Sequence, residues 1–299
     1  MTEQLKLKLN DSKATRWGAL VIVAFTMMAA YYVNDVVAPL KTMLETDLAW
    51  SSTDFGFFTG GYSFLNVFFL MLIWGGLILD RFGIRFTGKL ATILMVGGTA
   101  LEYYAMTGLA GADATLFGIN EIFGYKTGVF VAFAGYSIFG VGAEVAGITV
   151  SKIIAKWFKG KELATAMGVQ VALARIGSQA GYAVAIPLAR AFGISTPVLL
   201  GLVLLLGGMI AFFIFAVMDK KLDKQMEAAA IAAGTEDEEE KFSFKDVKNI
   251  LVNPGFWLIA LLCVLFYSCV FPFQKFASEL MIIKSVSYTH LTLPTNSRV

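Results

Sequence analysis

The sequence predicts an all-α membrane protein. Hydrophobic residues make up 57% of its 299 residues and charged residues only 15%, whereas soluble domains carry roughly 25% charged residues. Seven segments approach the length of about 20 apolar residues that a spanning helix needs. Phe (26) and Gly (29) are also abundant, as in membrane helices that pack closely.

The predicted spans follow one another with short connections. A polar, basic stretch, residues 1–16, precedes the first span, and no signal-peptide cleavage pattern follows that span. The first six spans are expected to form one bundle over residues 17–218, followed by a linker at 219–253 with an acidic run, and then by a seventh helix within 254–285. The seven spans cover residues 17–40, 54–79, 88–110, 128–151, 163–189, 196–218 and 255–276.

The basic residues alternate between the two ends of these spans. Cytoplasmic loops are rich in Lys and Arg, so the N-terminus is predicted to be cytoplasmic, and we expect a bacterial cytoplasmic (inner) membrane. The other side shows little beyond Lys41, Lys126 and Arg190. The cytoplasmic set comprises Lys6, Lys8, Lys13, Arg16, Arg81, Arg85, Lys89, Lys152, Lys156, Lys159, Lys161, Lys220, Lys221 and Lys224.

The loop GGLILDRFGIR between the second and third spans carries a motif. Gly76, Asp80, Arg81, Gly83 and Arg85 match G-x-x-x-D-R-x-G-x-[RK], which resembles the loop motif of the major facilitator superfamily. The glycine at 76 would let two helices approach, and the aspartate could cap a helix or pair with the arginine at 85. The resemblance implies two six-helix halves and a loop that latches them in the outward-facing state. One position departs, since Ile84 stands where many members have a basic residue.

A closer resemblance lies in YSFLNVFFL (62–70), LILDRFGIRF (77–86), GVGAEVAG (140–147), KWFKGKELATAMGVQVALARIGS (156–178) and YSCVFPF (267–273). These stretches are similar to the lysosomal dipeptide uniporter branch of the superfamily. That resemblance implies transport of dipeptides by alternating access, with no cofactor. Members of that branch work with an accessory subunit, and whether this chain has one stays open.

Two charged residues lie deep in predicted spans. A charge at the bilayer centre costs about 2.5–3.5 kcal/mol, so it is a functional candidate. Glu144 and Arg175 are equally far from the loop that joins their helices, and about ten helical residues on each side place both roughly 15 Å deep. An acid and a base at one depth suit the two ends of a zwitterion. The resemblance implies the same role for them. The alternative is a structural salt bridge, which would bring the charged atoms within about 4 Å.

Other polar residues allow two readings each. Tyr62 and Asn66 share one helix face and could line the solute cavity or hydrogen-bond between helices. Asp35 and Glu102 could relay protons or lie near the outer interface, which we favour. Tyr31 fits an interfacial aromatic belt.

No catalytic constellation, metal spacing, phosphate-cradling loop or basic-aromatic surface for nucleic acid is present. We therefore expect no enzyme, no metal and no cofactor, with a small solute and the lipid bilayer as partners.

The final stretch VSYTHLTLPT (286–295) is polar and fits no membrane helix. One allowed coding of it resembles the transposase end and adapter used in sequencing-library preparation. We expect residues 286–299 to be such read-through, which would leave His290 without a function. The missing partner would then be the C-terminal half of the same protein, with five further helices.

The sequence thus predicts a truncated transporter of small zwitterions, dipeptides foremost. The rival readings are an organic-anion antiporter or proton-coupled symporter, and a non-transporting membrane sensor or assembly subunit.

Overall fold

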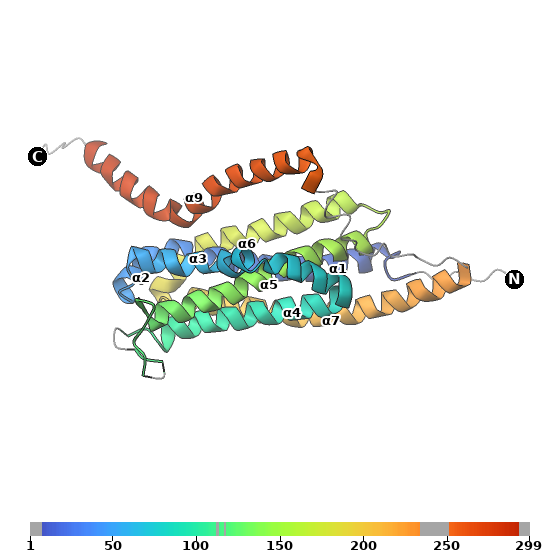
Figure 1. Ribbon diagram of the computed structural model, residues 1–299, viewed down its shortest axis with the longest axis horizontal. Helices are drawn as coiled ribbons and strands as arrows, with labels where there is room; N and C mark the ends of the chain where they lie inside the picture. The colour runs from blue at the N-terminus through green and yellow to red at the C-terminus, as the bar shows by residue number, and fades with distance from the viewer. Residues whose placement is uncertain (1–7, 112–113, 117, 234–250, 293–299) are drawn as a thin grey trace, which may run out of the picture.

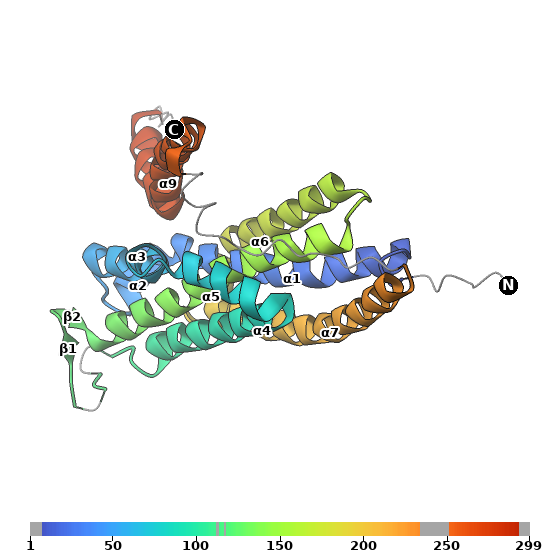
Figure 2. The same cartoon turned by 45° about the vertical axis from the view of Figure 1, so that its right-hand side comes forward.

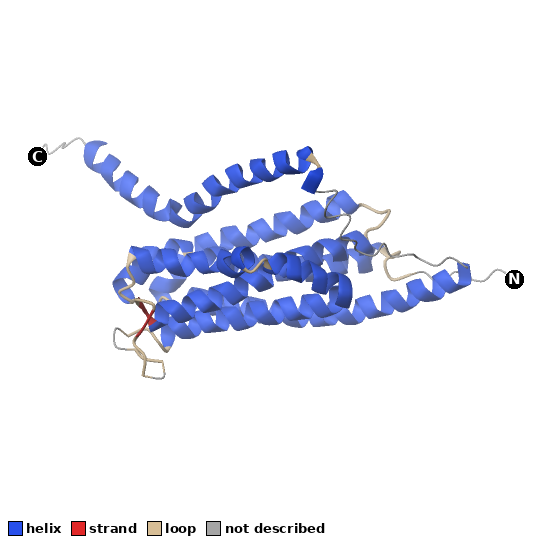
Figure 3. Ribbon diagram, viewed as in Figure 1, coloured by secondary structure: helices blue, strands red, loops and turns tan. Residues whose placement is uncertain are grey.

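The computed structural model describes residues 8–111, 114–116, 118–233 and 251–292 (Figure 1). Its regular structure is helical apart from a small hairpin of β1 (Glu121–Ile122) and β2 (Tyr125–Lys126) (Figure 3). The predicted all-α class is therefore confirmed. The helices are α1 (Lys13–Val36), η1 (Ala38–Leu40), α2 (Lys41–Asp47), α3 (Ser52–Phe68), α4 (Met71–Thr107), α5 (Thr127–Trp157), α6 (Leu163–Phe192), α7 (Thr196–Ala233) and α9 (Pro254–Thr292).

The long helices α1, α4, α5, α6 and α7 lie side by side with roughly parallel axes (Figure 1). Helix α5 packs against both α3 and α4, and α1 packs against both α6 and α7. Glycines allow the closest approaches. A Cβ on Gly140 would lie 2.4 Å from the carbonyl oxygen of Tyr62, and one on Gly177 would lie 2.1 Å from that of Met28. Only glycine fits there, so these contacts fix α5 against α3 and α6 against α1.

The second and third predicted spans are divided differently in the structure. Helix α3 ends at Phe68, and Leu70 adopts a left-handed conformation (φ 52°) before α4 begins. The two helices are bent by 58° at this break. Inside α4, Gly83 has φ 75° and interrupts the helix. The predicted span 54–79 therefore combines α3 with the first part of α4.

By length and apolarity, four helices in the described part of the chain could cross a membrane, and the bent pair α3 and α4 makes five. Helix α6 covers the predicted span 163–189 but does not pass this test. Each of the seven predicted segments is mostly helical, and the number of membrane crossings stays a prediction.

Two boundaries expected from the sequence were wrong. The linker was expected to begin at residue 219, but α7 continues as a helix to Ala233. The acidic run 236–240 lies outside the described residues. Helix α9 continues to Thr292, so the first part of the tail is helical, whereas the sequence was read as fitting no helix. Residues 293–299 lie outside the described part.

Helix α9 lies apart from the other helices for most of its length (Figure 2). It bends midway and contains Pro272 (Figure 1). Most of its large apolar side chains are exposed, from Phe256 to Phe273. Its contacts with the bundle concentrate near η1.

Candidate functional site

Glu144 lies on α5 one turn after Gly140, where α3 comes closest. It is half-buried, and its Oε1 atom accepts a hydrogen bond of 2.8 Å from the hydroxyl of Tyr62 on α3. The glycine contact between the helices makes this bond possible. Tyr62 therefore bonds between helices and orients the carboxylate.

Arg175 lies on α6, two residues before Gly177, and is exposed. Its guanidinium carbon lies 5.6 Å from the centroid of the Tyr31 ring on α1. A cation over an aromatic face within about 6 Å is attracted to it. Tyr31 thus supports the arginine, and its expected place in an interfacial belt stays a prediction.

Glu144 and Arg175 are not joined as a salt bridge. Among the described residues, no nitrogen of Arg175 lies within 4 Å of a carboxylate oxygen. Tyr31 belongs to α1, which packs against both helices that carry these charges, α5 and α6. The acid and the base therefore do not neutralise each other, which is the arrangement that the ligand-binding reading requires.

Asn66 follows Tyr62 by one helical turn. Its Nδ2 atom donates to the carbonyl oxygen of Tyr62 at 3.0 Å. Its Oδ1 atom is buried and has no hydrogen-bond partner in the described part of the chain. Asn66 thus bonds to its own helix and keeps one acceptor available.

Asp35 lies at the end of α1 and is buried, 6% exposed. Its Oδ1 atom accepts a hydrogen bond of 2.8 Å from Nδ2 of Asn34 and lies 3.8 Å from Nζ of Lys275 on α9. Asp35 therefore faces α9 inside the protein, and its favoured position near the outer interface stays a prediction.

Sequence reasoning missed Lys275. Its Nζ atom donates to the carbonyl oxygen of Asn34 at 2.6 Å and to the hydroxyl of Tyr136 on α5 at 2.9 Å. The available signal was a single basic residue at the end of an otherwise apolar span.

Glu102 on α4 is fully buried. Neither of its carboxyl oxygens has a hydrogen-bond partner among the described residues. Its expected position near the outer interface stays a prediction. A buried carboxyl without a partner is costly, so Glu102 remains a candidate for proton transfer.

The loop motif forms two separate ion pairs. Asp80 pairs with Lys152 at 2.8 Å, so it neither caps a helix nor pairs with Arg85, as the sequence had suggested. Arg85 instead lies 2.5 Å from Asp223 and 3.6 Å from Asp219, both on α7.

Asp219 is completely buried at the centre of this network of charges. It accepts from Nζ of Lys156 at 2.8 Å and from Nε1 of Trp157 at 3.0 Å. Lys156 also pairs with Asp223. The network joins α5, α4 and α7. Sequence reasoning missed the two aspartates because both fell in the expected linker.

The glycines of the motif differ from their predicted roles in one respect. Gly76 has open space around it, whereas a Cβ on Gly75 would lie 2.6 Å from Cγ2 of Val145. The close helix approach therefore belongs to Gly75. Gly83 makes the turn, and the guanidinium of Arg81 lies 5.5 Å from the ring centroid of Phe82.

A groove of about 500 Å³ lies away from these charges. Its lining contains no charged side chain, so it does not suit a zwitterion. It is lined by Gly56, Phe57, Gly60, Phe64, Phe123, Phe130 and Phe133. Within the described residues, no group of three His, Cys, Asp or Glu side chains could hold a metal ion.

Comparison with known proteins agrees with this architecture. The chain is 28% identical to the human (Homo sapiens) lysosomal dipeptide transporter MFSD1 over 274 residues, which cover 87% of this chain and 52% of the relative. The zebrafish (Danio rerio) protein of that name is 27% identical over 265 residues, or 85% and 52%. The chicken (Gallus gallus) protein is 35% identical over 152 residues, or 46% and 32%. The chain spans about half the length of the first two of these relatives.

The profile of the Major Facilitator Superfamily matches residues 20–293, which is most of the chain. The resemblance drawn from the loop motif and the span motifs is thereby confirmed. The chain is a multi-pass membrane protein and belongs to the Major Facilitator Superfamily.

Proposed function

We propose that the protein transports small zwitterionic solutes, dipeptides foremost, by alternating access. The observation that carries this proposal is the separation of Glu144 and Arg175. Two unlike charges in a membrane helix bundle would be expected to neutralise each other if they were only structural. Here each is supported by a tyrosine instead. The relatives are named dipeptide transporters, which favours the same class of solute.

The geometry suggests how the two ends of a solute are held. The guanidinium of Arg175 has donors that match a carboxylate in a bidentate arrangement. The carboxylate of Glu144 accepts from an ammonium group, and the Tyr62 hydroxyl keeps it oriented. A dipeptide separates its ends by about 6–7 Å, whereas a single amino acid has a much shorter separation. Asn66 supplies a further acceptor on the same face as Tyr62.

The motif loop belongs to the cytoplasmic side in this proposal, together with the N-terminus. Asp80 and Lys152 form a partly exposed pair, which is weak enough to open during a transport cycle. This is consistent with a loop that switches between states. A bacterial cytoplasmic membrane is the proposed location, and the second half of the transporter is the proposed partner.

Thermal unfolding of the full-length protein with alanyl-alanine tests the proposal. Alanyl-alanine should stabilise the parent, and both Glu144→Gln and Arg175→Ala should remove this effect. Glu121→Gln and Arg190→Ala are matched controls, because both residues are exposed on the outer side and lie away from the pair. Stabilisation that survives in both site variants would refute the proposed roles.

Two further experiments distinguish the rival functions. Stabilisation by succinate and not by alanyl-alanine would favour an organic-anion carrier, in which only Arg175 contacts the solute. Counterflow of labelled alanyl-alanine in liposomes separates transport from sensing. Binding without counterflow would favour a sensor.

A further inference from the structure

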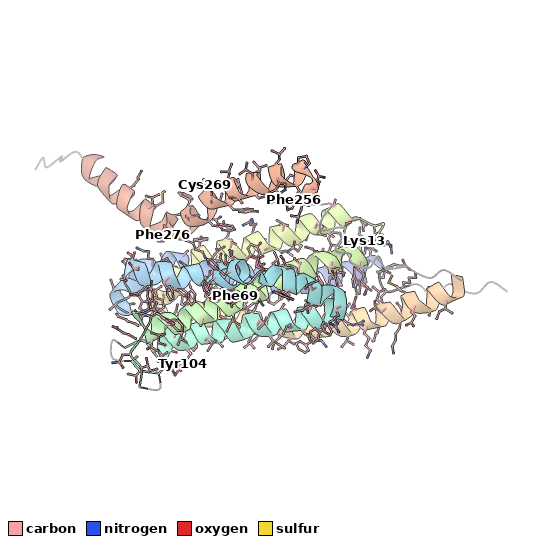
Figure 4. All side chains as sticks on the ribbon, viewed as in Figure 1. Lys13, Phe69, Tyr104, Phe256, Cys269 and Phe276 are labelled. Carbon is pink, nitrogen blue, oxygen red and sulfur yellow. The ribbon has the colours of Figure 1, made fainter. Side chains whose placement is uncertain are left out.

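Three consecutive residues attach α9 to the first bundle. The hydroxyl of Tyr182 on α6 donates to the carbonyl oxygen of Gln274 at 3.0 Å. The ring of Phe276 meets that of Phe55 on α3 edge to face, with centroids 5.9 Å apart. Lys275 lies between these two contacts. Figure 4 shows Phe276 near the bend of α9 and Phe256 towards its beginning, where the helix is exposed.

The ammonium group of Lys275 enters a cluster of oxygen acceptors. It donates to the carbonyl oxygen of Asn34 and to the hydroxyl of Tyr136, and it lies 3.8 Å from the carboxylate of Asp35. It also lies 5.5 Å from the centroid of the Tyr136 ring. These groups match the chemistry of a primary ammonium, which needs three hydrogen-bond acceptors and a negative charge nearby.

The cluster is built by the first bundle and not by α9. Tyr136 is completely buried, and its hydroxyl donates to the carbonyl oxygen of Asn34 at 2.8 Å. The side chain of Asn34 donates in turn to Asp35. Glu102, fully buried and without a hydrogen-bond partner in the described residues, interacts electrostatically with Lys275. The acceptors and their negative potential therefore belong to α1, α4 and α5.

The cluster adjoins the proposed solute site. The ring of Tyr62, whose hydroxyl donates to Glu144, has its centroid 5.6 Å from that of Tyr136 in the cluster. Tyr31, whose ring lies 5.6 Å from the guanidinium carbon of Arg175, is on the same helix as Asp35. Because Asp35 follows Tyr31 by one turn towards the outer end of α1, the cluster lies on the outer side of the solute pair.

We propose that this cluster, Asn34, Asp35 and Tyr136, is a binding site for primary ammonium groups. Lys275 occupies the site and thereby closes the outer end of the solute path, and the ammonium group of an entering solute displaces it. The displacement by solute rests on the proposed function, whereas the recognition of Lys275 by the bundle does not.

The distance between α2 and α9 reports whether Lys275 is docked. Thr42 on α2 and Met281 on α9 are exposed and can carry spin labels in the full-length protein, after Cys263 and Cys269 are replaced by Ala. Both cysteines are free and exposed, so these replacements should be tolerated. Labels at Thr42 and Thr107 of α4 provide a reference within the bundle.

Lys275→Ala should shift the distance distribution towards longer values. Loss of a charge-assisted hydrogen bond lowers the ratio of closed to open molecules by about tenfold or more. Lys275→Met keeps most of the apolar stem and should lengthen the distance in the same way. This second variant shows whether the result for Lys275→Ala comes from the lost ammonium group and not from misfolding. A parent-like distribution in both variants overturns the site.

Chemical rescue tests the specificity of the cluster. n-Propylammonium should restore the short distance in Lys275→Ala, and it should fail when Asp35→Asn is added. N,N,N-Trimethylpropylammonium carries the same charge but cannot donate hydrogen bonds, so it should not restore the distance. Equal rescue by both ions would overturn recognition of a primary ammonium.

The displacement step is tested in the parent. Alanyl-alanine should lengthen the distance between Thr42 and Met281, and N-acetyl-alanyl-alanine, which lacks the ammonium group, should not. Thermal stabilisation by alanyl-alanine without lengthening overturns displacement. Absence of any binding shows that the proposed function is wrong, and the rescue experiment then still decides whether the cluster binds ammonium groups.

Discussion

Replacement of Asp219 by Asn should destabilise the bundle far more than replacement of its neighbour Asp223. The carboxylate of Asp219 has 0% side-chain exposure, whereas that of Asp223 has 39%. Asp219 also accepts the indole hydrogen bond of Trp157. Removing one partner of a buried ion pair costs about 3–5 kcal/mol because the other charge is left uncompensated.

Two features place the expected cost of Asp219→Asn at the lower end of that range, about 3 kcal/mol. Lys156 is 24% exposed and keeps Asp223 as a partner, and the Asn amide oxygen can still accept from Trp157. Asp223→Asn removes contacts from a carboxylate that is more than one-third exposed, so water screens the loss and we expect about 1 kcal/mol or less.

Fluorescence-detected thermal unfolding of the two variants in detergent micelles measures this order. The same comparison at high salt adds a second criterion, because exposed pairs are screened and buried pairs are screened much less. The difference between Asp219→Asn and the parent should therefore persist at high salt. Equal destabilisation by the two variants, or a loss at Asp219 that disappears with salt, would refute the argument from burial.

Three further predictions use other parts of the fold. Gly75→Ala should destabilise by about 1–3 kcal/mol through overpacking, while Gly76→Ala, in open space, should be neutral or slightly stabilising; the reverse order in thermal unfolding would contradict the helix contact. Tyr62→Phe should weaken alanyl-alanine binding about fivefold by calorimetry, the value of one hydrogen bond, and unchanged affinity would exclude its role. The Lys161 ammonium, followed by a backbone N–H, lowers the pKa of Asp11. Because the folded pKa is below the unfolded one, the small stabilisation is present at neutral pH and is lost as pH falls through the folded pKa. Asp11→Asn should therefore destabilise slightly at pH 7 and make no difference in strong acid, and an equal effect at both pH values would contradict this.

The sequence could predict that Glu144 and Arg175 lie within long helices joined by a short loop, because charges are conspicuous in apolar segments. The pairing of Asp80 was not predictable. Its partner Lys152 is 72 residues away in sequence, and the choice between that lysine and Arg85 depends on how the helices are rotated about their axes.

Helix rotation also explains the other differences. Consecutive helical residues point about 100° apart, so the sequence could not decide whether Gly75 or Gly76 meets the neighbouring helix. The role of Lys275 was hidden because one of its acceptors is a backbone carbonyl, which every residue possesses. The sequence could not show that the start of the expected linker packs against the bundle, because the contacts of Asp219 with α4 and α5 exist only in the folded protein.

The charged residues of this bundle differ in whether they have an ion-pair partner and in which helix supplies it. At the end of the bundle that carries the loop motif, the charges of α4, α5 and α7 neutralise one another, as Lys156 and Asp219 do. At the opposite end, Asp35 meets a charge from α9. Between them, Glu144 and Arg175 have no ion-pair partner among the described residues. Because an ionised group inside a membrane is costly to keep, a charged solute that pairs with both residues, as we propose, would gain most by binding there.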